Sequence, residues 1–96
     1  MSQESESANS PELLELIEGC RKQSMKSQEA LYKRFYGYGF SICHQYAYSR
    51  DETVEIMNDA FLKVFQSLDH FDPNRSFKSW LRRIMVNTAI DHYRRS

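Results

Sequence analysis

The spacing of apolar residues is the feature that most limits how this chain can fold. After an acidic stretch near Arg50 that suits a helix N-terminus, apolar residues recur three and four positions apart, at Val54, Met57, Phe61, Val64, Phe65 and Leu68. This spacing places them on one broad face of an α-helix. No segment alternates apolar and polar residues as a half-buried strand does, so the sequence predicts an all-α fold.

Three other segments have the same helical period. A short helix is predicted over about residues 11–22, with Ser10 as its cap and Pro11 in its first turn. A longer helix is predicted from Ser27 to Tyr48, and a last one from the cap Ser76 to the chain end. The expected architecture is a small helical bundle of three longer helices plus a short N-terminal helix.

Apolar stripes on these helices define the candidate core. They comprise Leu13, Ile17 and Cys20, then Leu31, Phe35, Ile42 and Tyr46, and finally Phe77, Leu81, Ile84 and Thr88, with Trp80 and Met85 at the edges of the last stripe. Gly37 and Gly39 interrupt the second stripe, and each costs about 1 kcal/mol relative to Ala inside a helix. They indicate either a kink or a close helix contact, and the sequence leaves both open.

The length of 96 residues suits one small domain. Residues 1–9 are polar and rich in Ser and Glu, which predicts a disordered tail before a domain over residues 10–96. Cys20 and Cys43 match no metal or redox spacing, and the chain begins with no signal segment. It also lacks an apolar run of about 18 residues. We therefore expect a reduced, cytoplasmic protein with core-type thiols and no membrane partner.

The formal net charge of zero conceals two oppositely charged segments. Six acidic residues against Lys63 give residues 51–72 a net charge of −5, and six basic residues against Asp91 give residues 73–96 a net charge of +5. This asymmetry fits two different partners, one basic and one anionic. It equally fits two solvated helix faces that partly neutralise each other.

The last helix carries candidate nucleic-acid-binding residues. Arg83, Asn87 and Arg94 fall within about 40° of each other, opposite the apolar stripe. Arg binds phosphate, Asn reads a base edge, and the neighbouring Trp80 can stack on an exposed base. Arg95 adds charge near the helix end, and Arg82 does so on another side. A solvated helix with a basic last turn has the same pattern.

Two further polar groups are candidates for binding. The loop before the last helix contains Asp69, His70, Phe71, Asp72, Asn74, Arg75 and Ser76, which could cradle a base flipped out of a duplex. The preceding helix carries a mostly acidic patch of Glu55, Asn58, Asp59 and Leu62 within roughly 100° of arc. Such a patch suits protein docking, although polar loops and single exposed leucines are common in proteins without these functions.

Three ordered segments together resemble region 2 of the extracytoplasmic-function sigma factors, within the sigma-70 family. Residues 30–36 (A-L-Y-K-R-F-Y) open the second helix as in that family, and residues 55–65 (E-I-M-N-D-A-F-L-K-V-F) resemble its polymerase-binding helix. Residues 77–95 resemble its promoter-reading helix, F-x-x-W-L-x-R-I-A-x-N-x-x-x-D-x-x-R-R. The resemblance covers about residues 12–95, and matches of this kind are hypotheses that structural context must confirm.

The resemblance implies a transcription initiation factor domain that binds core RNA polymerase and recognises and melts the −10 promoter element. Glu55, Asn58, Asp59 and Leu62 would dock on the β′ clamp helices, and the loop from Asp69 to Ser76 would capture a non-template-strand base. Asn87 matches the family's base reader. Arg83 and Arg94 fit the DNA backbone, and Trp80 fits a position beside the opening duplex. No cofactor or metal is implied.

The chain departs from the family pattern in two places. Asn58 stands where the family usually has Gln, and the chain stops at Ser96 without a −35-reading helix-turn-helix domain. We expect a fragment of a longer protein rather than a one-domain member. An anti-sigma factor is a further candidate partner that the sequence does not identify.

Two other classes of function compete with this interpretation. An enzyme needs convergent acid, base or nucleophile groups, but His44, His70 and His92 lie in three different elements and the chain has no Gly-rich phosphate loop. We therefore expect no enzyme. The alternative is a stand-alone helical DNA-binding or protein-interaction module. The eight-residue link from Asp69 to Ser76 is longer than the turn of about three or four residues in a helix-turn-helix motif. A preference for single-stranded over double-stranded DNA would distinguish the sigma-factor interpretation from this alternative.

Overall fold

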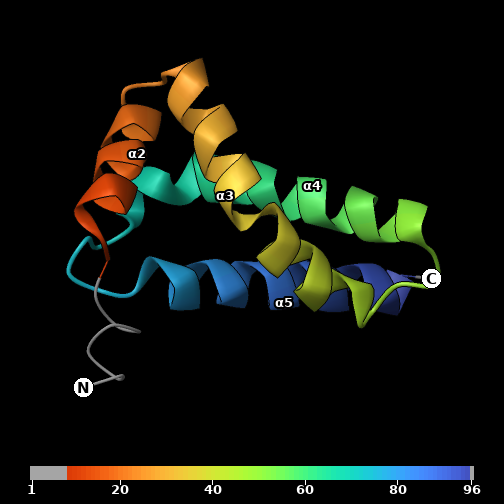
Figure 1. Ribbon diagram of the computed structural model, residues 1–96. Coiled ribbons are helices and arrows are strands. Elements are labelled where there is room, and N and C mark those ends of the chain that lie inside the picture. The colour runs from red at the N-terminus through yellow and green to blue at the C-terminus, as the bar shows by residue number, and fades with distance from the viewer. Residues whose placement is uncertain (1–8, 96) are drawn as a thin grey trace.

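Four α-helices and one short 3₁₀ helix make up the computed structural model, which describes residues 9–95 (Figure 1). In chain order they are α2 (Pro11–Arg21), α3 (Met25–His44), α4 (Arg50–Ser67), the 3₁₀ helix η1 (Leu68–His70) and α5 (Phe77–Arg95). Within these residues no strand forms. The predicted all-α class, with three longer helices and a short first one, is confirmed.

The helices α4 and α5 run antiparallel beside each other and are joined at one end by η1 and the loop after it (Figure 1). Helix α3 crosses both of them, and α2 lies at the end of the bundle where that loop passes. The first helix is therefore placed against the loop, which the sequence did not predict.

Each helix buries one stripe in a shared core. In α5 the buried residues are Phe77, Leu81, Met85, Thr88 and Ala89, and in α4 they are Thr53, Ile56, Met57, Ala60, Phe61 and Val64. The predicted stripes are close to these but rotated, since Ile84, Val54 and Phe65 are only half-buried. Helix α3 packs against both helices, and its Gly39 lies next to the buried Met57 of α4 and Met85 of α5.

Gly39 allows the three helices to approach closely. A Cβ atom at this position would lie 3.0 Å from Cε of Met85 and 3.4 Å from Cγ of Met57. At Gly37, in contrast, a Cβ would meet nothing within 4 Å. Of the two interpretations left open by the sequence, a close helix contact is therefore correct at Gly39.

The predicted end of α3 at Tyr48 is wrong, because the helix ends at His44. The helix ends there because Ser49 adopts an extended conformation and caps α4. The Oγ of Ser49 accepts a hydrogen bond of 3.1 Å from the Glu52 amide. In return, the Glu52 carboxylate accepts a bond of 2.7 Å from the Tyr48 amide. Helix α3 also begins earlier than predicted, at Met25, because Ser24 caps it through the Ser27 amide.

Both cysteines are buried and unpaired, as expected for core thiols. Burial raises the pKa of each of Cys20 and Cys43 to about 11. Both thiols are therefore protonated and unreactive near neutral pH.

Asn9, the last residue of the predicted N-terminal tail, is among the described residues. Its side chain makes hydrogen bonds with backbone groups of Pro73, Arg75 and Phe77, so it contacts the loop before α5 and the start of that helix. Residues 1–8, the rest of the predicted tail, lie outside the described residues. Between residues 9 and 95, no helix combines the length and apolar character needed to cross a membrane.

Candidate nucleic-acid interface

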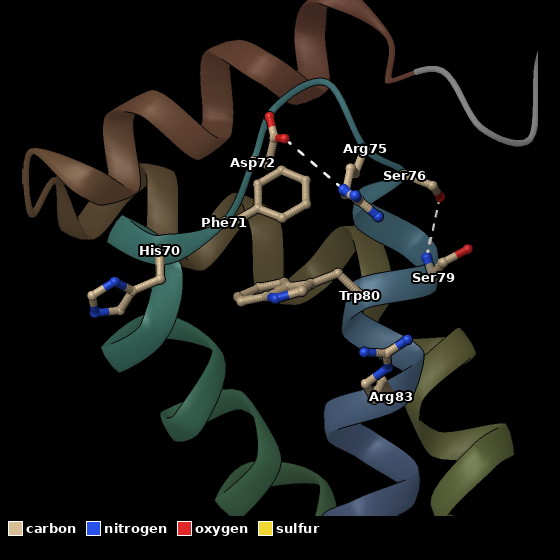
Figure 2. Close-up of a pocket in the computed structure, with 8 residues that line it drawn as sticks. All are labelled: His70, Phe71, Asp72, Arg75, Ser76, Ser79, Trp80 and Arg83. Carbon is tan, nitrogen blue, oxygen red and sulfur yellow. Dashed lines mark hydrogen bonds and ion pairs between the residues drawn. The ribbon is translucent and has the colours of Figure 1, made fainter.

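A pocket of about 370 Å³ lies where the loop meets the first turns of α5 (Figure 2). It is lined by His70, Phe71, Asp72, Arg75, Ser76, Ser79, Trp80 and Arg83. Its volume is within the range of roughly 300–1,000 Å³ found for small-molecule sites. Seven of these eight residues belong to the set predicted from the sequence, and Ser79 does not.

Local hydrogen bonds give the loop its turn. The Asp72 carbonyl accepts a bond of 2.9 Å from the Arg75 amide, and the Asp72 carboxylate accepts one of 3.0 Å from the Asn74 amide. The Ser76 hydroxyl then caps α5 through the Ser79 amide at 3.2 Å, as predicted. Asp, Asn and Ser form such turns and caps because their short side chains reach nearby backbone groups.

The two aromatic residues of the pocket are not equivalent. Phe71 is buried, with its ring centroid 5.4 Å from that of Phe77 at an interplanar angle of 90° and 5.0 Å from that of Trp80. Phe71 thus belongs to the core. Trp80 is half-buried and lies between the loop and Arg83 (Figure 2). Of this pair, Trp80 is the aromatic side chain that can stack on a base.

A second pocket, of about 340 Å³, adjoins the first along α5. It is lined by Ser79, Arg82, Arg83, Val86 and Asn87. Because Ser79 and Arg83 line both pockets, the two form one continuous surface that leads from the loop to Asn87. Sequence reasoning missed Ser79 as a site residue, although its position four residues before Arg83 and eight before Asn87 places it on the same helix face.

The basic residues of this surface are exposed, and those of α5 that were predicted to bind DNA have no carboxylate partner among residues 9–95. No ion pair joins Arg82, Arg83, Arg94 or Arg95 to a carboxylate of residues 9–95. Arg75 lies 3.9 Å from the Asp72 carboxylate, and both side chains are largely exposed (Figure 2). Between the acidic α4 and the basic α5, Nε2 of His92 lies 3.1 Å from the Asp59 carboxylate, a contact that is an ion pair only when the imidazole is protonated. Mutual neutralisation therefore explains little of the charge asymmetry.

Several predicted residues lie outside both pockets. Asp69 and Asn74 are exposed on the loop but line neither pocket. Arg94 and Arg95 lie in the last turn of α5, about 16 Å along the helix axis from Arg83. They extend the positive surface rather than the pocket.

The predicted docking patch on α4 is divided by its hydrogen bonds. Asn58 accepts a bond of 2.8 Å from the Tyr32 hydroxyl of α3, and Asp59 contacts His92 of α5. Glu55 and Leu62 lie between these anchored residues, and Leu62 is 54% exposed. Within residues 9–95, no group of three or more His, Cys, Asp or Glu side chains is placed to hold a metal ion.

This all-α bundle, with its pocketed loop and basic last helix, has the form of a sigma-factor domain. Residues 31–96 match the Sigma-70 region 2 family, which is more than half of the chain, so the chain belongs to that family. The resemblance to extracytoplasmic-function sigma factors is confirmed by its relatives.

Two curated relatives are similar over part of their length. The chain is 34% identical over 77 residues to the ECF RNA polymerase sigma-E factor of Escherichia coli K12, covering 80% of this chain and 40% of that protein. It is 34% identical over 56 residues to the ECF RNA polymerase sigma factor SigW of Bacillus subtilis, covering 58% of this chain and 30% of SigW. The chain thus spans less than half the length of these relatives.

A solved structure shares the fold. An engineered region 2 of sigmaE, determined by NMR in complex with GTAAAA, superposes with a TM-score of 0.78 at 32% sequence identity. The match covers 88% of this chain and 90% of that one.

Proposed function

We propose that this domain recognises a −10 promoter element by capturing an unpaired base of the non-template strand in the pocket beside Trp80. The observation that supports this most directly is the pocket itself, where a half-buried indole lies between a polar loop and the unpaired guanidinium of Arg83. Stacking on the indole suits any base, and the guanidinium suits the adjoining phosphate.

Helix α5 would read further bases along the same strand. Asn87 lines the second pocket together with Arg82 and Arg83, so an amide that can pair with a base edge shares this pocket with two phosphate-binding groups. The sigmaE domain of the same fold was solved with GTAAAA, which is consistent with a strand of this kind along α5.

Promoter melting would follow from differential binding. A pocket that accepts a flipped base binds the separated strand better than the paired one, and this difference shifts the equilibrium toward the open duplex. No ATP or metal is required for such a shift.

The partner that brings the domain to DNA would be core RNA polymerase, bound in the cytoplasm through α4. Glu55 and Leu62 form the accessible centre of the docking patch, while Asn58 and Asp59 are held at its two edges by α3 and α5. An apolar side chain surrounded by oriented polar groups suits a small protein interface. The β′ clamp helices are the surface implied by the family resemblance.

Trp80 makes the DNA proposal directly testable, because it is the only tryptophan of the chain. Single-stranded DNA of sequence GTAAAA should quench its fluorescence, and the same sequence in a duplex should do so much less. Trp80→Ala should weaken binding of the labelled single strand by about 1–3 kcal/mol. Tyr48→Ala, which removes an exposed aromatic residue outside the pocket, is the control and should leave the affinity unchanged.

Equal binding of the single strand and the duplex would contradict the proposal. It would favour the alternative of a stand-alone module that binds double-stranded DNA.

A further inference from the structure

We propose that Asn9 and Arg21 are positioning residues for base capture, which hold the backbone of residues 68–77 in the shape that forms the pocket. We call this pair the brace. The inference rests on the proposed function, and it assigns a role to residues that lie before the family match at residues 31–96.

Asn9 holds the second half of the loop. Its Nδ2 donates hydrogen bonds to the carbonyl oxygens of Pro73 and Arg75, at 3.0 and 2.8 Å. Its Oδ1 accepts a bond of 2.9 Å from the amide of Phe77, the first residue of α5. One side-chain amide thereby joins the loop to the start of the helix, where free backbone N–H groups need partners.

Arg21 holds the first half of the loop. Its Nε donates a hydrogen bond of 3.1 Å to the carbonyl oxygen of Leu68, and its Nη2 donates one to the carbonyl oxygen of Phe71. A guanidinium suits this task because its planar fork of donors is rigid. These two carbonyls belong to the first residue of η1 and to the residue after it, so Arg21 sets the direction in which the chain leaves α4.

The brace is itself held in place by α3. Asn9 precedes Ser10, which caps α2 by accepting a bond of 3.1 Å from the Leu13 amide and also accepts one of 3.3 Å from Nη2 of Arg34. At the other end of α2, Gly19 lies so close to α3 that a Cβ would overlap the side chain of Ser27. The two ends of α2 are thus fixed, and with them Asn9 and Arg21.

The brace binds only the backbone of the loop. His70, Asp72 and Arg75 remain exposed, and no hydrogen bond joins their side chains to Asn9 or Arg21. Their side chains are therefore accessible to DNA while the brace holds the backbone beneath them. A loop ordered before binding loses less conformational entropy when the base enters, which raises affinity for the captured base.

The test uses two variants of the 96-residue chain. Asn9→Asp removes the donors to Pro73 and Arg75 but keeps the acceptor for Phe77, and Arg21→Gln removes the fork at Leu68 and Phe71. Lys22→Gln is the matched control, because it removes the same charge at the next position, where the side chain is exposed. Changes in nonspecific phosphate attraction are then common to Arg21→Gln and its control.

Affinity is measured for single-stranded GTAAAA and for hexamers with one abasic position. For each position, the affinity for GTAAAA is divided by the affinity for the hexamer that lacks the base there. The position with the largest ratio in the wild type is the captured base, and the ratio at this position measures base capture. We expect both brace variants to reduce this ratio by about tenfold, the scale of a lost hydrogen-bonded constraint. The affinity for the abasic hexamer should fall no further in Arg21→Gln than in Lys22→Gln, because both lose one positive charge while Arg83 and Arg94 still bind phosphates. Lys22→Gln should keep the wild-type ratio.

Amide hydrogen exchange separates positioning from general stability. In the brace variants, exchange should rise at residues 69–76 and remain unchanged in the core of α4, under conditions where circular dichroism shows full helicity. If the wild type binds GTAAAA more tightly than an abasic hexamer and both variants keep this ratio, the role of the brace is overturned but the proposed function is not. A wild-type ratio of one at every position would instead overturn the proposed function, and the brace with it.

Discussion

Asn87 and Arg83 lie one helical turn apart on α5 but offer different chemistry. Asn87 presents an amide in the second pocket, and an amide can distinguish one base edge from another. Asn87→Ala should therefore reduce discrimination at one −10 position by about 1–3 kcal/mol. Binding of single strands that differ in one base would measure this. An equal loss for every base would contradict the role of Asn87 as a base reader.

Arg83 should act on all sequences alike, because an unpaired guanidinium at the junction of the two pockets suits a phosphate. Arg83→Ala should weaken every single strand to a similar extent. It should also reduce the slope of log affinity against log salt concentration by roughly 0.7, the value for one phosphate contact on a single strand. A salt titration of wild type and variant measures this, and an unchanged slope would remove Arg83 from the phosphate contacts.

The buried thiols should make the domain less stable in alkali. Burial raises the pKa of Cys43 from 9.0 to about 11, so the folded state keeps a proton that the unfolded state loses above pH 9. Stability is thus full below pH 9 and declines as pH rises toward 11. As pH rises from 8 to 10, deprotonation of this thiol in the unfolded state should lower the free energy of unfolding by about 1 kcal/mol.

Urea unfolding of the wild type and Cys43→Ala at both pH values measures this effect. The variant should be less stable at pH 8, because it leaves a cavity in the core, but its stability should fall less between the two pH values. Effects of pH on the other groups are common to both proteins and cancel in the comparison. An equal fall would mean that the Cys43 thiol does not contribute.

At the level of elements, α4 presents its docking patch as a unit. Its start is set by Ser49 and Glu52, and its two sides are held by Tyr32 of α3 and His92 of α5. The helix therefore presents Leu62 on a rigid surface. Because rigid elements position interface residues better than loops do, a change at Leu62 should act on binding and not on folding.

Leu62→Arg should abolish retention of the domain by purified core RNA polymerase in a pull-down, because a charge replaces the apolar centre of the patch. Leu14→Arg is the matched control, since Leu14 is a partly exposed leucine on α2 (36%), and it should be retained. Retention of Leu62→Arg would move the interface elsewhere. If the folded wild type were not retained either, the stand-alone module would be favoured.

For the whole molecule, the approach of α3 to α4 and α5 depends on Gly39. Gly39→Leu should lower the free energy of unfolding by about 1–3 kcal/mol or more, because the new side chain must displace Met57 and Met85. Gly37→Leu, two residues earlier on the exposed side, should raise it by up to about 1 kcal/mol through helix propensity. Thermal or urea unfolding of both variants measures the contrast, and equal effects would contradict close packing at Gly39.

Local patterns were enough to predict much of this domain. The period of the apolar residues, with Ser10 and Ser76 as caps, predicts helices whose interactions lie within a few positions of one another. The same local reasoning placed Arg83 and Asn87 on an exposed face and identified the loop before them. Helix ends were less well predicted, because the end of α3 depends on Ser49 capping the next helix.

Contacts between distant parts of the chain settled the rest. Phe71 is buried against Phe77 while the neighbouring Trp80 stays partly exposed. Met85 of α5 is buried next to Gly39 of α3, where a side chain would not fit without displacing it. Asn9 reaches backbone groups 64 to 68 positions away. No periodicity reports such contacts, because they arise only when separate helices pack and their side chains compete for the same space.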